Sequence, residues 1–345
     1  MKEGKEVDLV LAHHPLWKSL TENPPDGIKY KIRSGRSAKI YYRLNNFFRF
    51  SRNLVHFCNG AKPLKTRPWV VDCESVKVFF KSYEDLTNSR EVKRVEKLLM
   101  SEACRKIIPL SYASKRTLQR YLDIPEEKIE VVYPAVPAIS YKKEYTKKEV
   151  LNLLFIGGAF DAKGGREVIE AFKILSKSYP NLSLTIRGPV KEELLNDVKN
   201  VTILGRVLRN VLFEIYYPNT DIFLLPTYMD TVGYVLLEAM AFGIPIIATR
   251  YFAIPEIVKD AGLLIEPPTT LWKPDGSHNY NFLKDLSNEF PQTVNDLVDA
   301  LQRLIENEDL RRKLGDRGKR IVENGDISIK NRNRKLKKIY EDAFT

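Results

Sequence analysis

The stretch from Asp221 to Thr249 constrains the fold more than any other part of the sequence. It reads DIFLLPTYMDTVGYVLLEAMAFGIPIIAT: a short apolar run, a polar loop, an apolar helical segment and a second apolar run. Short strands that are apolar on both faces and alternate with helices are typical of parallel sheets covered by helices on both sides. The stretch therefore predicts one strand–helix–strand unit of an α/β domain.

The rest of the chain repeats this pattern in two halves, and 345 residues suit two domains. In the first half we predict strands at Val7–Ala12, Lys29–Ile32, Leu54–Phe57, Trp69–Val71, Lys106–Pro109 and Ile129–Tyr133. In the second half we predict strands at Leu151–Ile156, Leu182–Ile186, Val201–Leu204, Ile222–Leu225 and Ile246–Ala248, and helices at Gly165–Ser178, Val211–Tyr217 and Tyr234–Phe242. Each half is thus expected to form a doubly wound α/β domain.

A break separates the two halves at Pro134–Lys148, where two prolines and the charged run YKKEYTKKE interrupt the pattern. We therefore expect domains at residues 1–140 and 149–328, with residues 329–345 forming a helix that returns to the first domain. Pro267–Pro291 is polar and irregular and predicts a loop insertion. The segments after it have helical spacing: Val294–Ile305, Glu308–Glu323 and Ile327–Ala343.

Composition favours a cytoplasmic protein. Hydrophobic residues make up 43% and charged residues 29% of the chain, and no apolar run approaches the roughly 18 to 20 residues of a membrane-spanning helix. The N-terminal sequence has no cleavage site of the secretory type. The three cysteines, Cys58, Cys73 and Cys104, have neither CxxC spacing nor the Cys/His spacing of common zinc sites, so the sequence suggests neither a disulfide framework nor a metal site.

The positive charge is concentrated in the first half. Residues 1–140 carry 26 Lys and Arg against 16 Asp and Glu, whereas the rest carries 30 against 28. This asymmetry favours an anionic partner, which is a lipid headgroup, a phosphorylated acceptor or nucleic acid, although a solvated surface without a partner explains it equally well. The basic and aromatic stretch Arg36–Arg52 suits either an anionic membrane surface or packing against a sheet. It lacks a nucleic-acid-binding motif.

Two segments carry candidate binding chemistry. In LLFIGGAFDAKGGREVIEAF, a strand ends at Gly157 and Gly158, and Lys163 precedes a helix. Backbone N–H groups at a helix start and a nearby lysine form a phosphate site, although such glycine turns also serve tight packing alone. In the Asp221–Thr249 stretch, Asp230 lies in the loop and Glu238 on the apolar helix.

Asp230 and Glu238 are expected to face the crevice at the carboxyl end of the preceding strand, where ligands bind in open α/β sheets. A carboxylate on an apolar helix costs free energy unless a partner satisfies it. A vicinal diol of a ribose or hexose is one such partner. The alternative is an ion pair between Glu238 and a structural Arg or Lys.

The second half resembles the donor domain of the retaining glycosyltransferases of family 4, which have the GT-B fold. The resemblance spans Leu151 to Pro268 and rests on motifs in one order: IGGAFDAKGG, LTIRGP, VTILGRV, DIFLLPT, LLEAMAFGIPIIAT and IPEIVKDAGLLIEPP. The first half is similar only in outline. The resemblance implies two Rossmann-like domains whose parallel sheets face a deep interdomain cleft.

By this resemblance, Lys163 would contact the donor diphosphate, Glu238 the nucleotide ribose and Asp230 the transferred sugar. The backbone near Arg206 and Val207 would meet the base. The helix start would complete the donor site with Thr231, Val232, Gly233 and Tyr234. In the first half, Glu74 occupies the place of a His in many members and would contact the sugar or acceptor; the alternative is an exposed carboxylate at a strand end. The pair His13 and His14 is either cleft-facing or on the surface.

Two residues depart from the family pattern. Gly158 stands where the family usually has Arg, and Asp230 stands where it usually has Glu. Our hypothesis is that Arg166, Arg187 or Arg206 replaces the missing positive charge. The shorter Asp230 reduces the reach of the carboxylate by one methylene.

The resemblance implies a hexosyltransferase that moves a sugar from a UDP- or GDP-sugar to an acceptor hydroxyl with retention of configuration. No cofactor or metal would be obligatory. A glycan or lipid-linked acceptor and a peripheral position at the inner face of the cell membrane would fit the basic first half. The alternatives are an inactive sugar-nucleotide-binding subunit, favoured by Gly158 and Asp230, and another GT-B enzyme such as a sugar-nucleotide epimerase or a phosphorylase.

Overall fold

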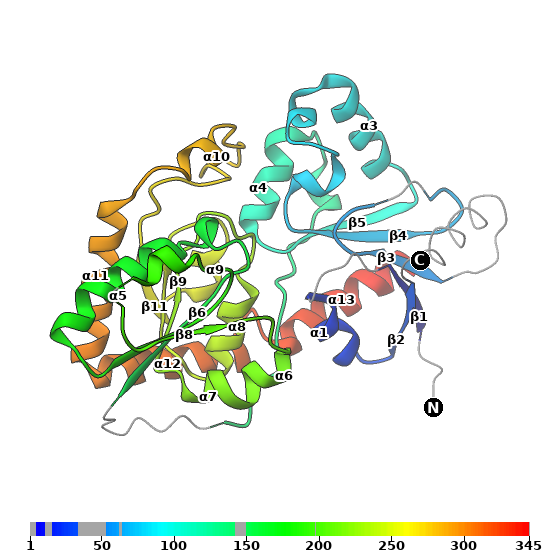
Figure 1. Cartoon of the computed structure of the whole chain (residues 1–345). Coiled ribbons are helices and arrows are strands. Elements are labelled where there is room, and N and C mark those ends of the chain that lie inside the picture. Colours follow the sequence, from blue (N-terminus) through cyan, green and yellow to red (C-terminus); the bar gives the residue numbers. More distant parts are fainter. Residues whose placement is uncertain are drawn as a thin grey trace. The chain divides into compact units, whose positions relative to one another are not determined.

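A computed structural model describes residues 5–10, 16–33, 53–61, 64–141, 150–196 and 198–344. The chain divides into two compact units (Figure 1). Unit 1 comprises Met1–Pro137, Pro274–His278 and Asp326–Thr345. Unit 2 comprises Ala138–Lys273 and Asn279–Gly325.

Unit 1 is built on a parallel sheet, as the apolar strands predict. Its five described strands lie in the order β2-β1-β3-β4-β5. They are β1 (Lys5–Val10), β2 (Ile28–Arg33), β3 (Leu54–Phe57), β4 (Trp69–Cys73) and β5 (Cys104–Pro109). Strands β3 and β4 are buried along their whole length, because helices and loops cover both faces of the sheet.

The helices of unit 1 begin where side chains can satisfy their free N–H groups. Asn88 accepts hydrogen bonds from the amides of Arg90 and Glu91 at the start of α3, and Ser111 accepts one from Ser114 at the start of α4. Helix α13, at the end of the chain, packs on β3 and β5. The α-helices are α1 (Leu16–Glu22), α3 (Ser89–Leu99), α4 (Tyr112–Tyr121) and α13 (Ile329–Phe344), and the 3-10 helices are η1 (Val76–Phe79), η2 (Glu84–Thr87) and η3 (Glu126–Lys128).

The prediction of a sixth strand at Ile129–Tyr133 was wrong. This segment runs beside β5 and donates two hydrogen bonds to it, from Glu130 N to Ile107 O and from Val132 N to Pro109 O. Only one bridge forms, between Ile107 and Ile129. The next bond of the ladder would need an N–H group on Pro109, which proline lacks. The ladder therefore stops after one pair.

Unit 2 carries the second predicted parallel sheet, with its described strands in the order β11-β10-β9-β6-β7-β8. The strands are β6 (Leu151–Ile156), β7 (Leu182–Arg187), β8 (Val201–Leu204), β9 (Ile222–Leu225), β10 (Ile246–Thr249) and β11 (Gly262–Ile265). Successive strands run outward from β6 through β7 to β8, and the chain then crosses back so that β9 pairs with the other side of β6. The strand order thus reverses between β6 and β9.

Helices cover the sheet of unit 2, with α5 packed against α11 and α8 against α12. The helix predicted at Val211–Tyr217 is three short pieces: α6 (Arg209–Val211), a π-helical turn η6 (Leu212–Tyr216) and α7 (Tyr217–Asn219). Strand β11 and α9 (Ile254–Val258) were not assigned from the sequence, and α10 (Phe282–Asp285) lies within the predicted irregular insertion. The remaining helices are α5 (Gly165–Ser178), α8 (Tyr234–Ala241), α11 (Pro291–Glu306) and α12 (Glu308–Asn324), and the 3-10 helices are η4 (Asp161–Lys163) and η5 (Glu192–Leu195).

Several sequence predictions fall outside the described residues. They are the pair His13 and His14, the stretch Arg36–Arg52 and residues 142–148 of the predicted linker. Within the described residues, each helix is too short or too polar to span a bilayer.

Candidate functional site

The candidate site of unit 2 lies where the strand order reverses. The loops that follow β6 and β9 leave the sheet side by side at this point, at the carboxyl ends of two paired strands. Crevices at such switch points are where open α/β sheets bind ligands. The loop after β6 carries Lys163 and the loop after β9 carries Asp230, and the two side chains form an ion pair with 2.5 Å between Nζ and Oδ2.

The two loops are held together by backbone contacts as well as by this ion pair. Tyr228 donates its N–H to Ala162 O at 2.9 Å, and Lys163 Nζ donates to Met229 O at 2.8 Å. Gly164 has a left-handed backbone (φ +74°), and a Cβ there would lie 2.3 Å from Pro226 O. Glycine is needed at this position because only a residue without a side chain permits both the conformation and the close approach.

We expect Gly164→Ala to destabilise the protein by about 2–4 kcal/mol, because left-handed strain adds to a backbone clash. Gly158→Ala is the matched control. A Cβ at Gly158 would meet no atom within 4 Å, so we expect a change of about 1 kcal/mol or less. Urea unfolding of the two variants measures both effects. Equal midpoints would show that the two loops do not need this close approach.

Asp230 organises the start of α8 in addition to pairing with Lys163. Its Oδ1 accepts hydrogen bonds from Gly233 N at 2.7 Å and from Val232 N at 3.2 Å. Gly233, with φ +66°, turns the chain into the helix. Asp230 therefore connects the lysine to the amides at the helix start, where the helix dipole favours negative charge.

Glu238 lies one turn further along α8, and its side chain is 5% exposed. Its two oxygens accept hydrogen bonds from different partners, Oε1 from Arg209 Nε and Oε2 from Tyr217 OH, both at 2.7 Å. Burial raises the pKa of Tyr217 well above its usual value, and the Glu238 carboxylate raises it further, so the phenol stays protonated and donates. The structure thus contains the ion pair with an arginine that the sequence left as the alternative.

Arg209 is the main residue of this region that the sequence reading missed. Its side chain is 30% exposed, so the ion pair with Glu238 is open to solvent on one side. The guanidinium lies 4.5 Å from the ring centre of Phe213 and 5.9 Å from that of Tyr234. Tyr234 and Glu238 share a face of α8 because they are four residues apart. Arg209 therefore lies beside the first turn of the helix whose start Asp230 organises.

The other predicted site residues of unit 2 lie at the carboxyl ends of its strands. Gly157 N donates to Arg187 O, which joins the ends of β6 and β7. Arg187 Nε is buried and has no hydrogen-bond partner among the described residues. Arg166 donates to Leu286 O and approaches Asp161, so it already has partners. The remaining predictions differ in exposure: Gly158 and Arg206 are exposed, and Val207, Thr231 and Tyr234 are half-buried.

The structure brings these residues into two clusters that share α8. One contains Lys163, Asp230 and the amides of Val232 and Gly233, and the other contains Glu238, Tyr217, Arg209 and Tyr234. Glu74 belongs to unit 1, directly after β4, where its N–H donates to Asn59 Oδ1. The roles of all these residues in binding and catalysis stay predictions.

One segment of unit 2 is similar to a known protein family. Residues 151–272 match the family model described as Glycosyl transferases group 1. This segment is therefore similar to group 1 glycosyl transferases. It contains every residue of the two clusters. The match covers about a third of the chain and includes the stretch Leu151–Pro268 on which the resemblance rests.

Similar proteins agree with this assignment. An uncharacterized glycosyltransferase of Haemophilus influenzae is 29% identical over 48% of this chain and 47% of its own length. The O-antigen chain mannosyltransferase RfbU of Salmonella typhimurium is 24% identical over 77% of this chain and 80% of its own. The chain spans about half the length of several curated relatives that it matches.

The fold is also that of solved glycosyltransferases. The sucrose-phosphate synthase of Thermosynechococcus elongatus superposes with a TM-score of 0.69 over 99% of both chains, at 15% sequence identity. The predicted GT-B fold class, with two parallel-sheet α/β domains, is confirmed.

Proposed function

We propose that this chain is a glycosyltransferase that moves a sugar from a nucleoside-diphosphate sugar to an acceptor hydroxyl with retention of configuration. The observation that carries the proposal is the contact between Lys163 and Asp230 at the switch point of unit 2. The Lys163 ammonium group, the Asp230 carboxylate and the amides at the start of α8 are thus next to one another. Such a combination suits a ligand that joins a diphosphate to a sugar.

In this proposal the diphosphate takes the place of the Asp230 carboxylate as the partner of Lys163. The ammonium group and the positive end of α8 then stabilise the charge that develops on the departing phosphate. Asp230, released from Lys163, accepts hydrogen bonds from hydroxyls of the transferred sugar. The helix start holds these groups in place before the donor arrives, so little reorganisation is needed.

Glu238 would bind the ribose, so at least one of its two carboxylate oxygens must lose its present hydrogen bond. Tyr217 is fully buried and keeps its bond to Oε2, whereas Arg209 is partly exposed and can turn away from Oε1. We propose that Arg209, rather than Arg166, then approaches the diphosphate and supplies the charge that Gly158 lacks. Arg166 is less suited because it is held by the carbonyl of Leu286.

Restoring the family's arginine is expected to strengthen donor binding. Gly158 is exposed, its backbone is outside the left-handed region, and a side chain there would meet open space. Gly158→Arg should add one charge-assisted contact to the diphosphate, worth about 1.5–3 kcal/mol, or about a 10-fold or greater gain in affinity. Isothermal titration measures the gain, with Gly158→Gln as the uncharged control. A Gly158→Arg variant no tighter than Gly158→Gln would indicate that the diphosphate lies elsewhere.

The donor can be identified by thermal-shift screening of the full chain against UDP-, GDP- and ADP-sugars. We expect one nucleotide class to raise the melting temperature in a concentration-dependent way, because a ligand that binds only the folded state stabilises it. Release of the nucleoside diphosphate in the presence of acceptor glycans then tests transfer. Absence of a shift with all three classes would refute the proposed donor, and a shift without transfer would favour an inactive binding subunit.

The acceptor side of the proposal rests on charge. The excess of Lys and Arg in residues 1–140 favours a phosphorylated or lipid-linked glycan acceptor and an anionic membrane surface. Co-sedimentation with vesicles tests the membrane part. Binding to vesicles with anionic lipid, but not to neutral vesicles, is expected.

A further inference from the structure

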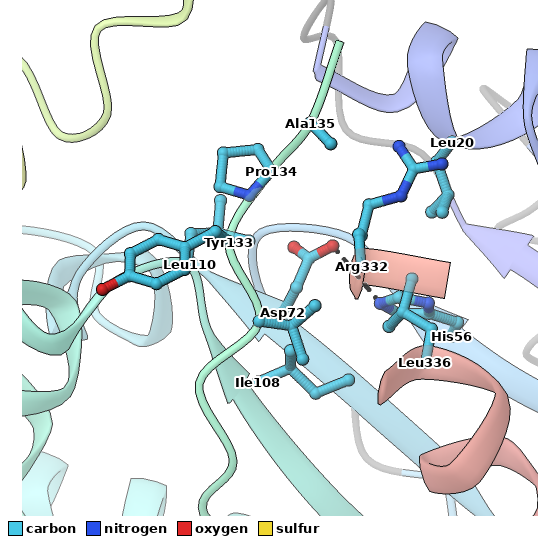
Figure 2. Close-up of a pocket in the computed structure, with 11 residues that line it drawn as sticks. Leu20, His56, Asp72, Ile108, Leu110, Tyr133, Pro134, Ala135, Arg332 and Leu336 are labelled. Carbon is cyan, nitrogen blue, oxygen red and sulfur yellow. Dashed lines mark ion pairs between the residues drawn. The ribbon is translucent and has the colours of Figure 1, made fainter. Parts of the chain in front are cut away.

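A cluster of three buried side chains in unit 1 can hold a metal ion. The side chains of His56, Cys58 and Asp72 each offer a ligand atom, and these atoms all lie within 4.8 Å of one another. Their exposed fractions are 1%, 3% and 5%. Figure 2 shows His56 and Asp72 pointing toward each other across the end of the sheet. The proposed transfer reaction uses none of the three.

Strand geometry explains why these residues meet. His56 lies in β3, and Cys58 is the first residue after this strand. Because one residue separates them, the two side chains face the same side of the sheet. Strand β4 pairs with β3 in parallel, with His56 opposite Val70 and Phe57 opposite Val71. Asp72 comes two residues after Val70 in β4, so it lies on the same face of the sheet as Val70 and His56. The two neighbouring strands therefore present an imidazole, a thiol and a carboxylate on one face.

The groups behind the cluster are those that orient metal ligands. Tyr340 OH lies 2.7 Å from His56 Nδ1, which leaves Nε2 toward Asp72. Asn59 donates its N–H to Asp72 Oδ1 at 2.7 Å, which leaves Oδ2 toward His56. Histidines and carboxylates that bind metals usually have their second polar atom held in this way. The Tyr340 hydroxyl is held in turn by Tyr30 OH at 2.9 Å.

His56 Nε2 is the atom that lacks a good partner. It lies 3.2 Å from Asp72 Oδ2 but makes no hydrogen bond of ordinary donor geometry within the described part of the chain. A buried polar atom without a hydrogen bond costs about 1–3 kcal/mol. A cation between Nε2, Oδ2 and the Cys58 sulfur would give Nε2 a partner and would replace the hydrogen bond between Cys58 and Asp72.

A cavity of about 40 Å³ adjoins the cluster, and His56 and Asp72 form part of its lining. This volume accommodates a water molecule. The cationic side chain in its lining, Arg332, donates to Asn23 O at 2.6 Å, and its guanidinium lies toward Leu20 in Figure 2. The cavity can therefore supply a water as a fourth ligand.

We propose that His56, Cys58 and Asp72 form a binding site for a divalent cation of the zinc class, with a water from the adjoining cavity as the fourth ligand. One nitrogen, one sulfur and one oxygen suit Zn²⁺ or Co²⁺, whereas Mg²⁺ and Ca²⁺ prefer oxygen ligands alone. Binding converts the Cys58 thiol to a thiolate, and the proton leaves to solvent. The bound ion would fasten β3 and β4 beneath α13, which Tyr340 joins to the site.

Cobalt titration of the full chain, after treatment with a chelator, tests the proposal. Co²⁺ alone is the probe, because a cysteine ligand gives a thiolate-to-cobalt charge-transfer band that imidazole and carboxylate ligands do not give. We expect one Co²⁺ per chain, a charge-transfer band and the d–d bands of tetrahedral geometry, all lost on addition of one equivalent of Zn²⁺. Absence of stoichiometric binding, or binding without the charge-transfer band, would overturn the proposal without any variant.

Two cysteine variants locate the site. Cys58→Ser should lose the charge-transfer band, and Cys104→Ser, which removes another buried thiol of the same sheet, should retain it. Circular dichroism shows whether each variant is folded. Zn²⁺ should raise the melting temperature of the wild type and of Cys104→Ser but not that of Cys58→Ser. A band that persists in Cys58→Ser would contradict the assignment and would leave His56 and Asp72 as an ordinary buried pair.

Discussion

Replacing Lys163 by alanine is expected to weaken nucleotide-sugar binding by about 10- to 100-fold. The variant loses a charge-assisted hydrogen bond to the diphosphate, worth about 1.5–3 kcal/mol. It also leaves Asp230 without the cation that neutralises it, so the carboxylate would repel the diphosphate. Isothermal titration of the best donor into wild type and variant measures the change.

Lys173→Ala is the matched control for this substitution. Lys173 lies in α5, which follows Lys163 in the chain, and forms a partly exposed ion pair with Glu170. Exposed pairs contribute about 0–1 kcal/mol, so stability and donor affinity should both stay near those of the wild type. Equal donor affinities for Lys163→Ala and Lys173→Ala would remove Lys163 from the diphosphate site.

Two substitutions of Glu238 separate its effect on the stability of the fold from its effect on donor affinity. Glu238→Ala leaves the buried Tyr217 hydroxyl without an acceptor and Arg209 without its ion-pair partner, so we expect a loss of about 2–4 kcal/mol. Glu238→Gln keeps a carbonyl oxygen for Tyr217 and should cost less. Both variants should bind the donor at least about 10-fold more weakly, because a ribose diol prefers a carboxylate. Urea unfolding and isothermal titration measure the two quantities.

Arg209→Ala distinguishes a structural ion pair from a binding role for Glu238. If Arg209 moves to the diphosphate, its removal frees Glu238 but lowers donor affinity. If Arg209 only neutralises Glu238, its removal leaves donor affinity unchanged or raises it.

A folded Glu238→Gln variant that binds the donor as tightly as the wild type would exclude Glu238 from the ribose site.

Local sequence signals were enough to predict the two sheets and most of their strands. Continuous apolar runs such as Ile222–Leu225 and Ile246–Ala248 are buried on both faces, so the pattern that predicts them is also the reason they form. The run Ile129–Tyr133 is apolar except for Glu130, but it pairs with a strand that ends in Pro109, whose missing N–H stops the ladder. That obstacle lies in the partner strand and is invisible in the run itself.

The partners of the site residues could not be predicted in the same way. Lys163 and Asp230 meet because β9 pairs with β6, a pairing that depends on the strand order of the whole sheet. Arg209 precedes Glu238 by 29 residues and lies before a π-helical turn, so no helical or strand spacing connects them. His56 and Cys58 are joined by Asp72 only through the register of β3 and β4, and His-x-Cys is not a common zinc spacing.

Hydrogen exchange on the full chain tests the central claim, that the donor binds where the loops after β6 and β9 meet. With the donor identified by thermal shift, we expect slower exchange in residues 157–166 and 226–238 and little change along α11 and α12. Protection that leaves both loops unchanged while appearing elsewhere in the chain would contradict the account.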